Sequence, residues 1–474
     1  MSVSLYQTGV SGLLSAQQQL ATTGHNIANV NTEGYSRQRV EQNASWGIVD
    51  GNHVVGSGTY VDDITRIYDQ FSYREQLITQ SGSSGANELH QSLNQLNEIM
   101  SFSGEAMISS VESFYQSVNS IADNPSDLGL RSIALSQAEI ISSDFRRLNE
   151  NFNQLEASIN TEINEMVSQV SEIGVELAKI NEMLLHRSDL THVGQSNDLL
   201  DTRDRLVHQL AKLTNVNTLE DQYGVMTVTI GQGTTLVAGV TPLGVSVAGG
   251  DPDPLQTELR LQLPNSSVEL DATKLGGAIS AKFEFRDQHL KQVRNDIDRL
   301  AMSVSDTLNT SQANGLDLNG QQGNNLFSDI NSLAAQQARV LDFSSNAGTL
   351  QAQLTITDVS LLPAHEFSIE FDGTDYLMTN LKDQSIINLG ADGAGTYTTP
   401  FGFEFIEASG TPATGDKFLL RPNENAAANI QVELTDGATI AASTAVEITP
   451  SSNNISAGKV AISDMLDPIT ARAK

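Results

Sequence analysis

The side chains that could do chemistry are few and lie far apart in the sequence. The eight histidines occur singly, at positions 25, 53, 90, 186, 192, 208, 289 and 365. Two zinc ligands on one helix face would lie four residues apart, but His186 and His192 are six apart. The chain contains no cysteine, which excludes a thiolate metal site, a disulfide and a cysteine nucleophile. We therefore expect no metal ion and assign each histidine to a polar helix face.

Three short motifs match known ligand or catalytic loops only in part. "GQGTTL" (231–236) has two glycines of a dinucleotide loop, but a leucine replaces the third and strands follow it. "NGLDLNGQQGNN" (314–325) would place a glycine and a leucine at positions where a calcium loop needs ligands. "SAGK" (456–459) matches Ser-x-x-Lys without the companion motifs of penicillin-binding enzymes. We expect no catalytic residue, no cofactor and no enzyme.

Two short runs place acids beside bases. They are "DDITR" (62–66) and "DTRDR" (201–205). Such groups are mostly solvated helix faces, or pairs four residues apart that contribute only a few tenths of a kcal/mol. We interpret both runs as solvated faces or local pairs of this kind.

Charge and composition exclude several classes of partner. The 26 basic and 57 acidic residues give a net charge of −31, which argues against nucleic acid and against an anionic membrane. The first Lys or Arg is Arg37 and there is no long apolar run, so we predict neither a signal peptide nor a transmembrane helix. The 474 residues suffice for two to four domains.

Long helices are the strongest structural signal. Residues 134–184 carry apolar side chains at alternating spacings of four and three, with one stutter where two fours meet at Ile159. Unbroken, such a helix would span roughly 75 Å at about 1.5 Å per residue, so we predict an elongated molecule. An earlier helix is predicted over residues 89–121 and ends at "DNP". A third is predicted over 197–213, with Asn197 or Asp198 as its N-cap.

The period changes from 3.6 to 2 near residue 223, which predicts strands. "VMTVTIGQGTTLVAG" (225–239) and "FSIEFDGTDYLMTN" (367–380) are typical of hairpins, and "FGFEFIEASGTPATGDKFLL" (401–420) repeats that design with a longer loop. We predict an α+β, multidomain, elongated fold, in which a coiled-coil rod carries two projecting β-rich insertions. The predicted segments are an axial helix and turn (1–40), a helical rod (41–220), a first β-insertion (221–280), a returning helix (281–345), a second β-insertion (346–445) and the start of a C-terminal return (446–474).

The N-terminus carries its own heptad. Tyr6, Leu13, Leu20 and Ile27 recur every seven residues, and no charged residue apart from His25 occurs from Met1 to Thr32. A solvated surface helix would show Lys, Glu or Arg on its outer face, so this helix is expected to pack among others. The alternative is a frayed polar N-terminus.

The sequence within and after this helix has a specific resemblance. "SGLLSAQQQL" and "NIANVNTEGYSRQ" resemble the N-terminal signature of the bacterial flagellar rod, hook and hook-associated proteins. The matching positions are Ser11, Gly12, Leu13, Ala16, Leu20, Asn26, Ile27, Ala28, Asn29, Asn31, Thr32, Gly34 and Tyr35. The resemblance implies that these residues form a subunit-interaction motif, in which the helix lines an axial tube and the Asn-rich turn leads outward.

The same resemblance implies a function, a location and partners. "RIYDQFSYREQL" (66–77), "NDLLDTRDRLVHQL" (197–210) and "GGAISAKFEFRDQHL" (276–290) are similar to segments of the longer hook-associated members. Such a chain would be secreted without a cleaved signal peptide and would form the junction between hook and filament. Its implied partners are the hook protein, a second junction protein, copies of itself in a ring, the flagellar export apparatus and an export chaperone. A hook or distal-rod protein, or a non-flagellar coiled-coil adhesin, is the alternative.

One part of the family pattern is not found. Members of the family close with a C-terminal heptad helix that pairs with the N-terminal one, whereas residues 446–474 contain no such heptad and Pro468 interrupts their apolar stretch. We expect the returning portion to be missing, which leaves open a truncated gene or a native short form.

Overall fold

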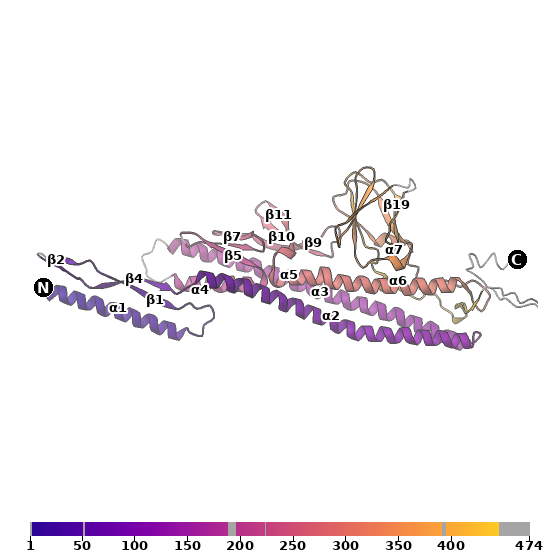
Figure 1. Ribbon diagram of the computed structural model, residues 1–474, viewed down its shortest axis with the longest axis horizontal. Helices are drawn as coiled ribbons and strands as arrows, with labels where there is room; N and C mark the ends of the chain where they lie inside the picture. Colours follow the sequence, from indigo (N-terminus) through magenta and orange to yellow (C-terminus); the bar gives the residue numbers. More distant parts are fainter. Residues whose placement is uncertain (1, 51–52, 188–195, 223, 391–394, 445–474) are drawn as a thin grey trace, which may run out of the picture. The chain divides into compact units, whose positions relative to one another are not determined.

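The computed structural model describes residues 2–50, 53–187, 196–222, 224–390 and 395–444 (Figure 1). These residues pack into two units. The first contains the described residues within 2–92, 160–248 and 257–285, and the second contains 93–159, 249–256 and the described residues after 285. Helices α2 (Gln70–Asp123) and α3 (Leu128–Arg187) run through both units. Long helices beside several sheets confirm the expected α+β class.

Helix α3 buries the apolar stripe that the sequence predicts. The stripe from Ala134 to Leu184 comprises fifteen apolar positions at the predicted spacing. Fourteen of them are buried, among them Phe145, Leu148 and Ile159, each with no measurable exposure. Met166 is only half-buried, and the neighbouring Val167 is buried as well. This departure lies one to two turns after the stutter, where the heptad seam shifts around the helix.

Helix α2 shows a feature that its apolar pattern does not reveal. It buries a row of serines at heptad spacing, Ser103, Ser110 and Ser117. The hydroxyls of Ser110 and Ser117 donate to the carbonyl oxygens of Met107 and Phe114, at 2.9 and 2.6 Å. Because these bonds satisfy the hydroxyls within the helix, a small polar side chain can occupy the buried seam.

Besides its segments of α2 and α3, the first unit contains short strands and helices. Its N-terminal module consists of α1 (Ser2–Ala28), the antiparallel pair β1 (Gln38–Ala44) and β4 (Thr59–Arg66), and the pair β2 (Ile48–Asp50) and β3 (His53–Val55). The prediction of a helical rod from residue 41 is therefore wrong at its start, where strands β1 to β4 occupy most of the described residues from 38 to 66. Strand β4 contains the β-branched residues Thr59, Val61, Ile64 and Thr65, which favour strands.

The rest of this unit follows α3. It comprises α4 (Asn197–Leu213), the sheet β5 (Val216–Glu220), β6 (Met226–Ile230), β7 (Thr234–Ala238) and β8 (Thr241–Pro242), the sheet β9 (Gly244–Gly249), β10 (Thr257–Leu263) and β11 (Ser266–Leu270), the 3₁₀ turn η1 (Ala272–Lys274) and α5 (Gly277–Glu284). The N-cap of α4 is Ser196 rather than Asn197 or Asp198. The predicted β6–β7 hairpin is confirmed, and Gly231 adopts a positive φ of 58° in its turn. A Cβ atom there would lie 2.7 Å from the carbonyl oxygen of Lys274, so only glycine fits.

A buried lysine joins three helices of the first unit. The Nζ atom of Lys282 on α5 lies 2.7 Å from Glu88 Oε1 of α2 and 2.5 Å from Glu162 Oε2 of α3. It also donates to the hydroxyl of Ser92 at 3.1 Å. With both carboxylates and the hydroxyl satisfied, the charge of Lys282 is compensated where it is removed from water.

The second unit contains the returning helix and a β-sandwich. A π-helical turn, η2 (Phe285–Leu290), leads into α6 (Lys291–Ala313), which ends well before the predicted residue 345. The pair β12 (Gly315–Leu316) and β21 (Ser443–Thr444), the helices α7 (Leu333–Ala338) and α8 (Ala426–Asn429), and the 3₁₀ turns η3 (Val359–Leu361) and η4 (Gly437–Thr439) complete the unit around the sandwich.

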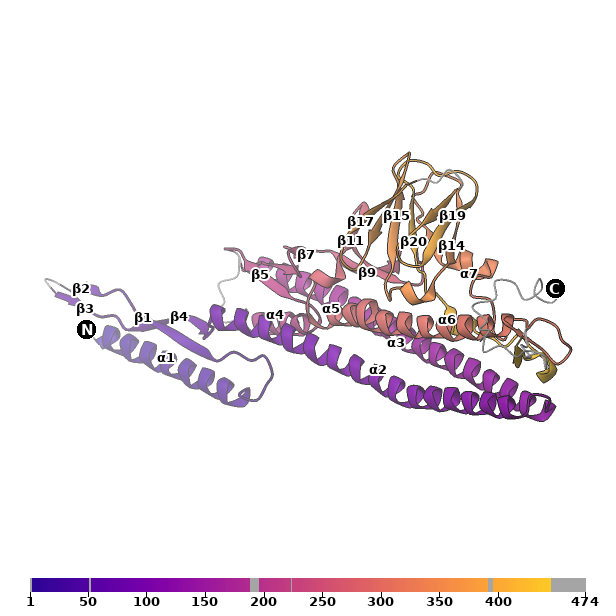
Figure 2. The ribbon, with the colours of Figure 1, turned by 45° about the vertical axis from the view of Figure 1, so that its right-hand side comes forward.

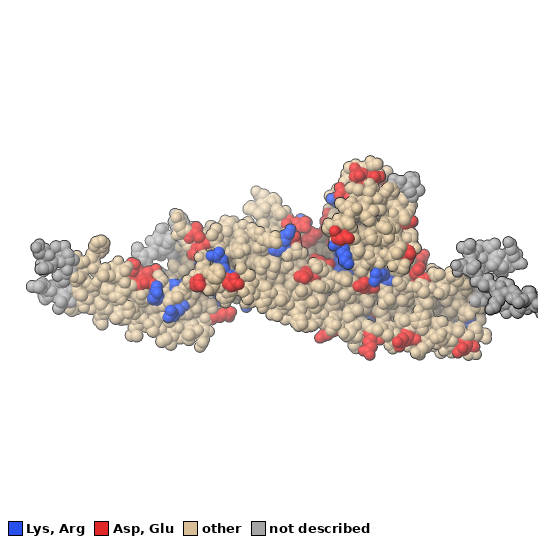
Figure 3. Space-filling model, in the orientation of Figure 1, with Lys and Arg blue, Asp and Glu red and all other residues tan. Residues whose placement is uncertain are grey.

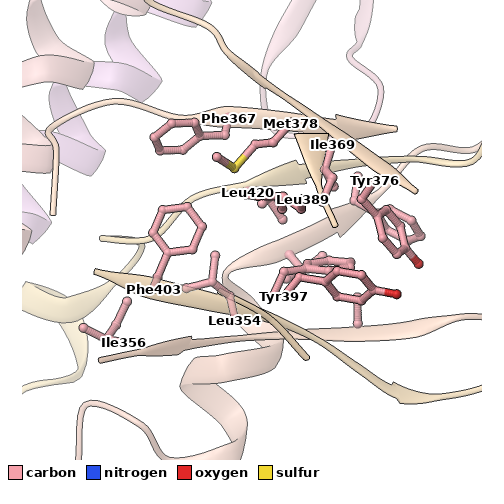
Figure 4. Packing of buried hydrophobic residues seen from close by; sticks show 14 of the residues in the cluster. Leu354, Ile356, Phe367, Ile369, Tyr376, Met378, Leu389, Tyr397, Phe403 and Leu420 are labelled. Carbon is pink, nitrogen blue, oxygen red and sulfur yellow. The ribbon is translucent and has the colours of Figure 1, made fainter. Parts of the chain in front are cut away.

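Two sheets form the sandwich, and their facing sides make its core (Figures 2 and 4). One sheet has the order β13 (Val340–Asp342), β20 (Lys417–Leu420), β15 (Phe367–Phe371), β16 (Tyr376–Asn380) and β17 (Ile386–Leu389), and the other β14 (Gln351–Ile356), β19 (Phe403–Ser409) and β18 (Thr396–Thr398). The β15–β16 hairpin is confirmed. The second predicted hairpin is wrong, because β19 and β20 belong to different sheets: β19 pairs with β14, and β20 with β15.

The loop "GGDPDP" (249–254) contributes one ion pair and two hydrogen bonds within this unit. The carboxylate of Asp251 accepts from the backbone N–H and the hydroxyl of Ser344, at 2.9 and 2.8 Å. Asp253 Oδ2 lies 2.8 Å from Arg421 Nη1, and Arg421 Nε lies 3.0 Å from Glu366 Oε1. Ser344 and Arg421 lie just after strands β13 and β20 of the sandwich. The loop is therefore a structural part of the second unit. The predicted return at 446–474 and the Ser-x-x-Lys motif lie outside the described residues.

Candidate assembly surface

Helix α1 faces inward with its polar side and outward with its apolar side. Ser15 and Thr22 are 3% and 6% exposed, because they lie toward the β1–β4 pair. The four heptad residues are exposed: Tyr6 74%, Leu13 69%, Leu20 73% and Ile27 70%. A helix that packed only within its own chain would show the opposite pattern. The stripe is therefore a surface to which no described part of the unit is packed.

The Asn-rich turn fixes α1 onto strand β1. The Asn26 side chain donates from Nδ2 to the carbonyl oxygen of Gln38 at 2.9 Å, and its Oδ1 accepts from the Gln38 backbone N–H at 2.8 Å. The Tyr35 hydroxyl donates to the same Oδ1 at 2.7 Å. The Asn26 side chain thus satisfies both backbone groups of Gln38, as a paired strand would. Only a side-chain amide can donate and accept in this way.

Further hydrogen bonds stabilise the turn that follows Asn26 in the sequence. The Asn29 Nδ2 atom donates to the carbonyl oxygen of His25, and the Thr32 backbone N–H donates to the carbonyl oxygen of Asn29. Gly34 has a φ of 80°, and a Cβ atom there would lie 3.3 Å from Arg205 Cβ. A residue with a side chain would be strained at this position. The turn is therefore specific in both its side-chain bonds and its backbone.

The structure divides the thirteen motif residues into two groups. One group holds the N-terminal module together: Asn26, Asn29, Thr32, Gly34, Tyr35 and Ser11. The hydroxyl of Ser11 accepts from the Thr59 backbone N–H at 3.2 Å. The other group is exposed and consists of Leu13, Ala16, Leu20, Ile27, Ala28 and Asn31. Gly12 belongs with this group, because a Cβ atom added there would meet no neighbour within 4 Å. Leu14 and Val30, which the sequence motif omits, are also exposed, at 59% and 73%.

A groove of about 780 Å³ continues this surface between α1 and β1. Its apolar lining includes Ile27, Val30, Val40 and Ile67. Gln19, Arg37 and Arg39 are among its polar lining residues. The exposed stripe thus leads at its C-terminal end into a groove that could receive side chains of another chain.

Sequence reasoning missed the ion pairs that join the N-terminal module to α4. Arg66 ends β4, and its Nε lies 2.9 Å from Asp201 Oδ1 as an ion pair without hydrogen-bond geometry. Its Nη2 donates to Asp204 Oδ2 and, at 3.1 Å, to the hydroxyl of Ser36. Arg203 lies beside Asp204, with 3.7 Å between Nε and Oδ1. The interpretation of these runs as solvated faces or local pairs is wrong for Arg66, Asp201 and Asp204, which pair across the two runs with little exposure. It holds for Asp62, Asp63 and Arg205, which are exposed.

Burial sets the electrostatics of this cluster, which we call the Arg66 clamp: Arg66, Asp201, Asp204 and Ser36. Burial raises the pKa of Asp201 above its ordinary value, and Arg66 and the bonds from Ser36 oppose that rise. Burial also lowers the pKa of the neighbouring His208. The only sequence signal for the clamp is the Asp-x-x-Asp spacing of Asp201 and Asp204, which places two carboxylates on one helix face.

Within the described residues, no group of three or more His, Asp or Glu side chains is arranged to hold a metal ion. None of the helices in the described part of the chain is both long and apolar enough to cross a lipid bilayer.

Comparison with known proteins identifies related sequences for most of the chain. Residues 7–35 match the model of flagella basal body rod proteins, residues 93–327 that of the FlgK helical domain, and residues 341–422 that of the D2-like domain of flagellar hook-associated protein 1. Flagellar hook-associated protein 1 of Escherichia coli K12 is 28% identical over 451 residues, and that of Salmonella typhimurium LT2 is 27% identical over 450. These alignments cover 92% and 94% of this chain, and 79% and 80% of the relatives.

A solved structure shares the fold. The flagellar hook junction protein FlgK from Burkholderia pseudomallei superimposes with a TM-score of 0.69 at 22% identity, over 78% of this chain and 66% of that one. The matched family models and relatives place this chain among the structural components of the bacterial flagellum. The chain belongs to the flagellar hook-associated protein 1 family.

Proposed function

We propose that this chain forms part of the junction between hook and filament, and that the exposed stripe of α1 is the surface that packs against neighbouring axial subunits. The observation that carries the proposal is the exposure of Tyr6, Leu13, Leu20 and Ile27 on a helix whose polar face is turned inward. Covering a large apolar side chain contributes about 1.5–3 kcal/mol, so four such residues supply a substantial interface.

The proposed neighbours are the hook protein, a second junction protein and copies of this chain in a ring. The proposed route is secretion by the flagellar export apparatus without cleavage of the N-terminus, with an export chaperone. An N-terminus that carries the packing surface supports this route, because cleavage would remove the stripe. The proposed role is purely structural, without catalysis.

Leu13→Asp and Leu20→Asp are expected to abolish assembly. Each places an unpaired carboxylate in the proposed interface, at about 3–5 kcal/mol per buried charge. The measurement is complementation in a strain that lacks its own member of this family, with filaments on hooks counted by electron microscopy. Gln18→Glu, which adds the same charge to an exposed position away from the stripe, should assemble normally.

The far-UV circular dichroism of each purified variant is a second control. Since Leu13 and Leu20 are exposed in the isolated chain, both variants should keep the parental spectrum. Normal filaments with either aspartate variant would refute the proposed interface.

A further inference from the structure

A second exposed apolar face lies on α2 within the second unit. Ile108 and Tyr115 are 64% and 54% exposed, whereas Met107 and Phe114, the residues directly before them, are buried. Phe102, which is 80% exposed, lies six residues before Ile108 and so about 120° around the helix from it. Ile108 and Tyr115 are seven residues apart, so they lie one above the other on the outer face of the helix. Large apolar side chains exposed in sequence along one helix are uncommon unless another chain covers them.

A groove lies beside Tyr115. It has a volume of about 200 Å³, roughly that of one large apolar side chain. The lining residues are Val111, Phe114 and Tyr115 of α2, Ile141 of α3, and Ser303, Val304, Thr307 and Leu308 of α6. An apolar groove beside an exposed tyrosine is the usual form of an anchor site in a protein interface.

The charges that lie close to this face in the sequence are negative. Glu98, Glu105 and Glu112 follow one another at heptad spacing, and the last two precede Ile108 and Tyr115 by three residues, which places each carboxylate beside its apolar neighbour. No Lys or Arg occurs between Arg74 and Arg131. The charged residues within three positions of the groove's lining residues are Glu112, Glu139, Asp144 and Asp306, of which Asp144 pairs with Arg147. Figure 3 shows acidic groups repeated along the lower edge, on the side of α2.

We propose that this α2 surface, formed by Phe102, Ile108, Tyr115, the glutamate row and the groove, docks an amphipathic helix of another protein that presents Lys or Arg beside its apolar stripe. One large apolar side chain enters the groove, and the basic side chains face Glu105 and Glu112. A second copy of the same face would oppose carboxylate to carboxylate, so charge complementarity selects a different, basic partner. The inference is independent of the role proposed for α1.

The test uses the full chain and a labelled peptide of three heptads, with Leu at the apolar positions and Lys beside them. A second peptide carries Glu in place of Lys. Fluorescence anisotropy should show binding of the lysine peptide only. Tyr115→Ala should weaken that binding about tenfold or more, the loss typical of an anchor residue. Glu105→Gln combined with Glu112→Gln should weaken it by a similar factor and reduce its dependence on salt.

A matched control separates a specific surface from general attraction to an acidic protein. Glu165→Gln combined with Glu172→Gln makes the same change in net charge at exposed heptad positions of α3. This variant should retain the parental affinity. Equal losses in the control and the α2 variant, or equal binding of the two peptides, would overturn the proposal. So would a concentration-dependent dimer that Tyr115→Ala abolishes, since a second copy would then be the partner.

Discussion

Arg66→Ala is expected to lower the free energy of unfolding of the first unit by about 3–5 kcal/mol, the usual effect of removing one partner from a buried ion pair. The side chains of Arg66, Asp201 and Asp204 are 8%, 12% and 8% exposed, so the two carboxylates would remain out of water without their main counter-charge. Arg203 compensates Asp204 only from 3.7 Å. Urea unfolding followed by circular dichroism measures the loss.

The control for Arg66→Ala is Arg39→Ala. Arg39 pairs with Glu41 at 2.6 Å, but both side chains are exposed, and pairs of this kind contribute at most about 1 kcal/mol. Equal stability losses in the two variants would contradict the role of the clamp. Hydrogen exchange should also show faster opening of residues 34–44 in Arg66→Ala alone, since Ser36 loses its partner on Arg66.

The defect of Arg66→Ala should shrink as the pH falls. Burial already raises the pKa of Asp201 in the folded chain, and loss of Arg66 removes an influence that lowers it. A carboxyl group with a raised folded pKa binds its proton more tightly when folded, so stability decreases as the pH rises toward that pKa. The difference from the parent is thus largest above the raised pKa of Asp201 and shrinks as the pH falls and Asp201 takes up its proton.

Asp298→Asn is expected to stabilise the second unit above pH 7 and to leave it unchanged near pH 4. Asp298 on α6 is 2% exposed, and its Oδ1 accepts from the Ala427 backbone N–H at 2.7 Å. Burial, with Glu424 nearby, raises its pKa from 3.8 to about 7, although the backbone bonds oppose the rise. The folded chain therefore holds an extra proton between these pH values, and stability falls as the pH rises through them. At about 1.4 kcal/mol for each tenfold change, the full effect is about 4 kcal/mol.

An asparagine keeps the acceptor for Ala427 and carries no charge at any of these pH values. The measurement is a series of urea unfolding curves from pH 4 to pH 8 for the parent and the variant. Asp296→Asn is the matched control, because Asp296 lies on the same helix but is 44% exposed and pairs with Arg299 at 3.3 Å. Parallel pH profiles of parent and Asp298→Asn would show that Asp298 does not titrate in this range.

The sequence by itself determined the helices and their buried faces. The alternation of three and four along 134–184 specifies one face of a helix, because each turn takes 3.6 residues wherever the helix lies. The hairpins β6–β7 and β15–β16 were also predictable, since each depends on a short turn between neighbouring strands. The Asn-rich stretch after Ile27 was recognisable as a helix end and as a family motif.

Only the tertiary structure decided which distant elements meet. Strands β19 and β20 are neighbours in the sequence, yet they separate into opposite sheets because the sandwich core needs an apolar face on each side. Arg66 finds its carboxylates more than 130 residues away, a pairing that no local spacing encodes. The heptad of α1 likewise predicts an apolar face, but it does not predict which element or chain packs against that face. The structure leaves that face exposed, because Asn26, Ser15 and Thr22 hold the polar side of the helix against the strands.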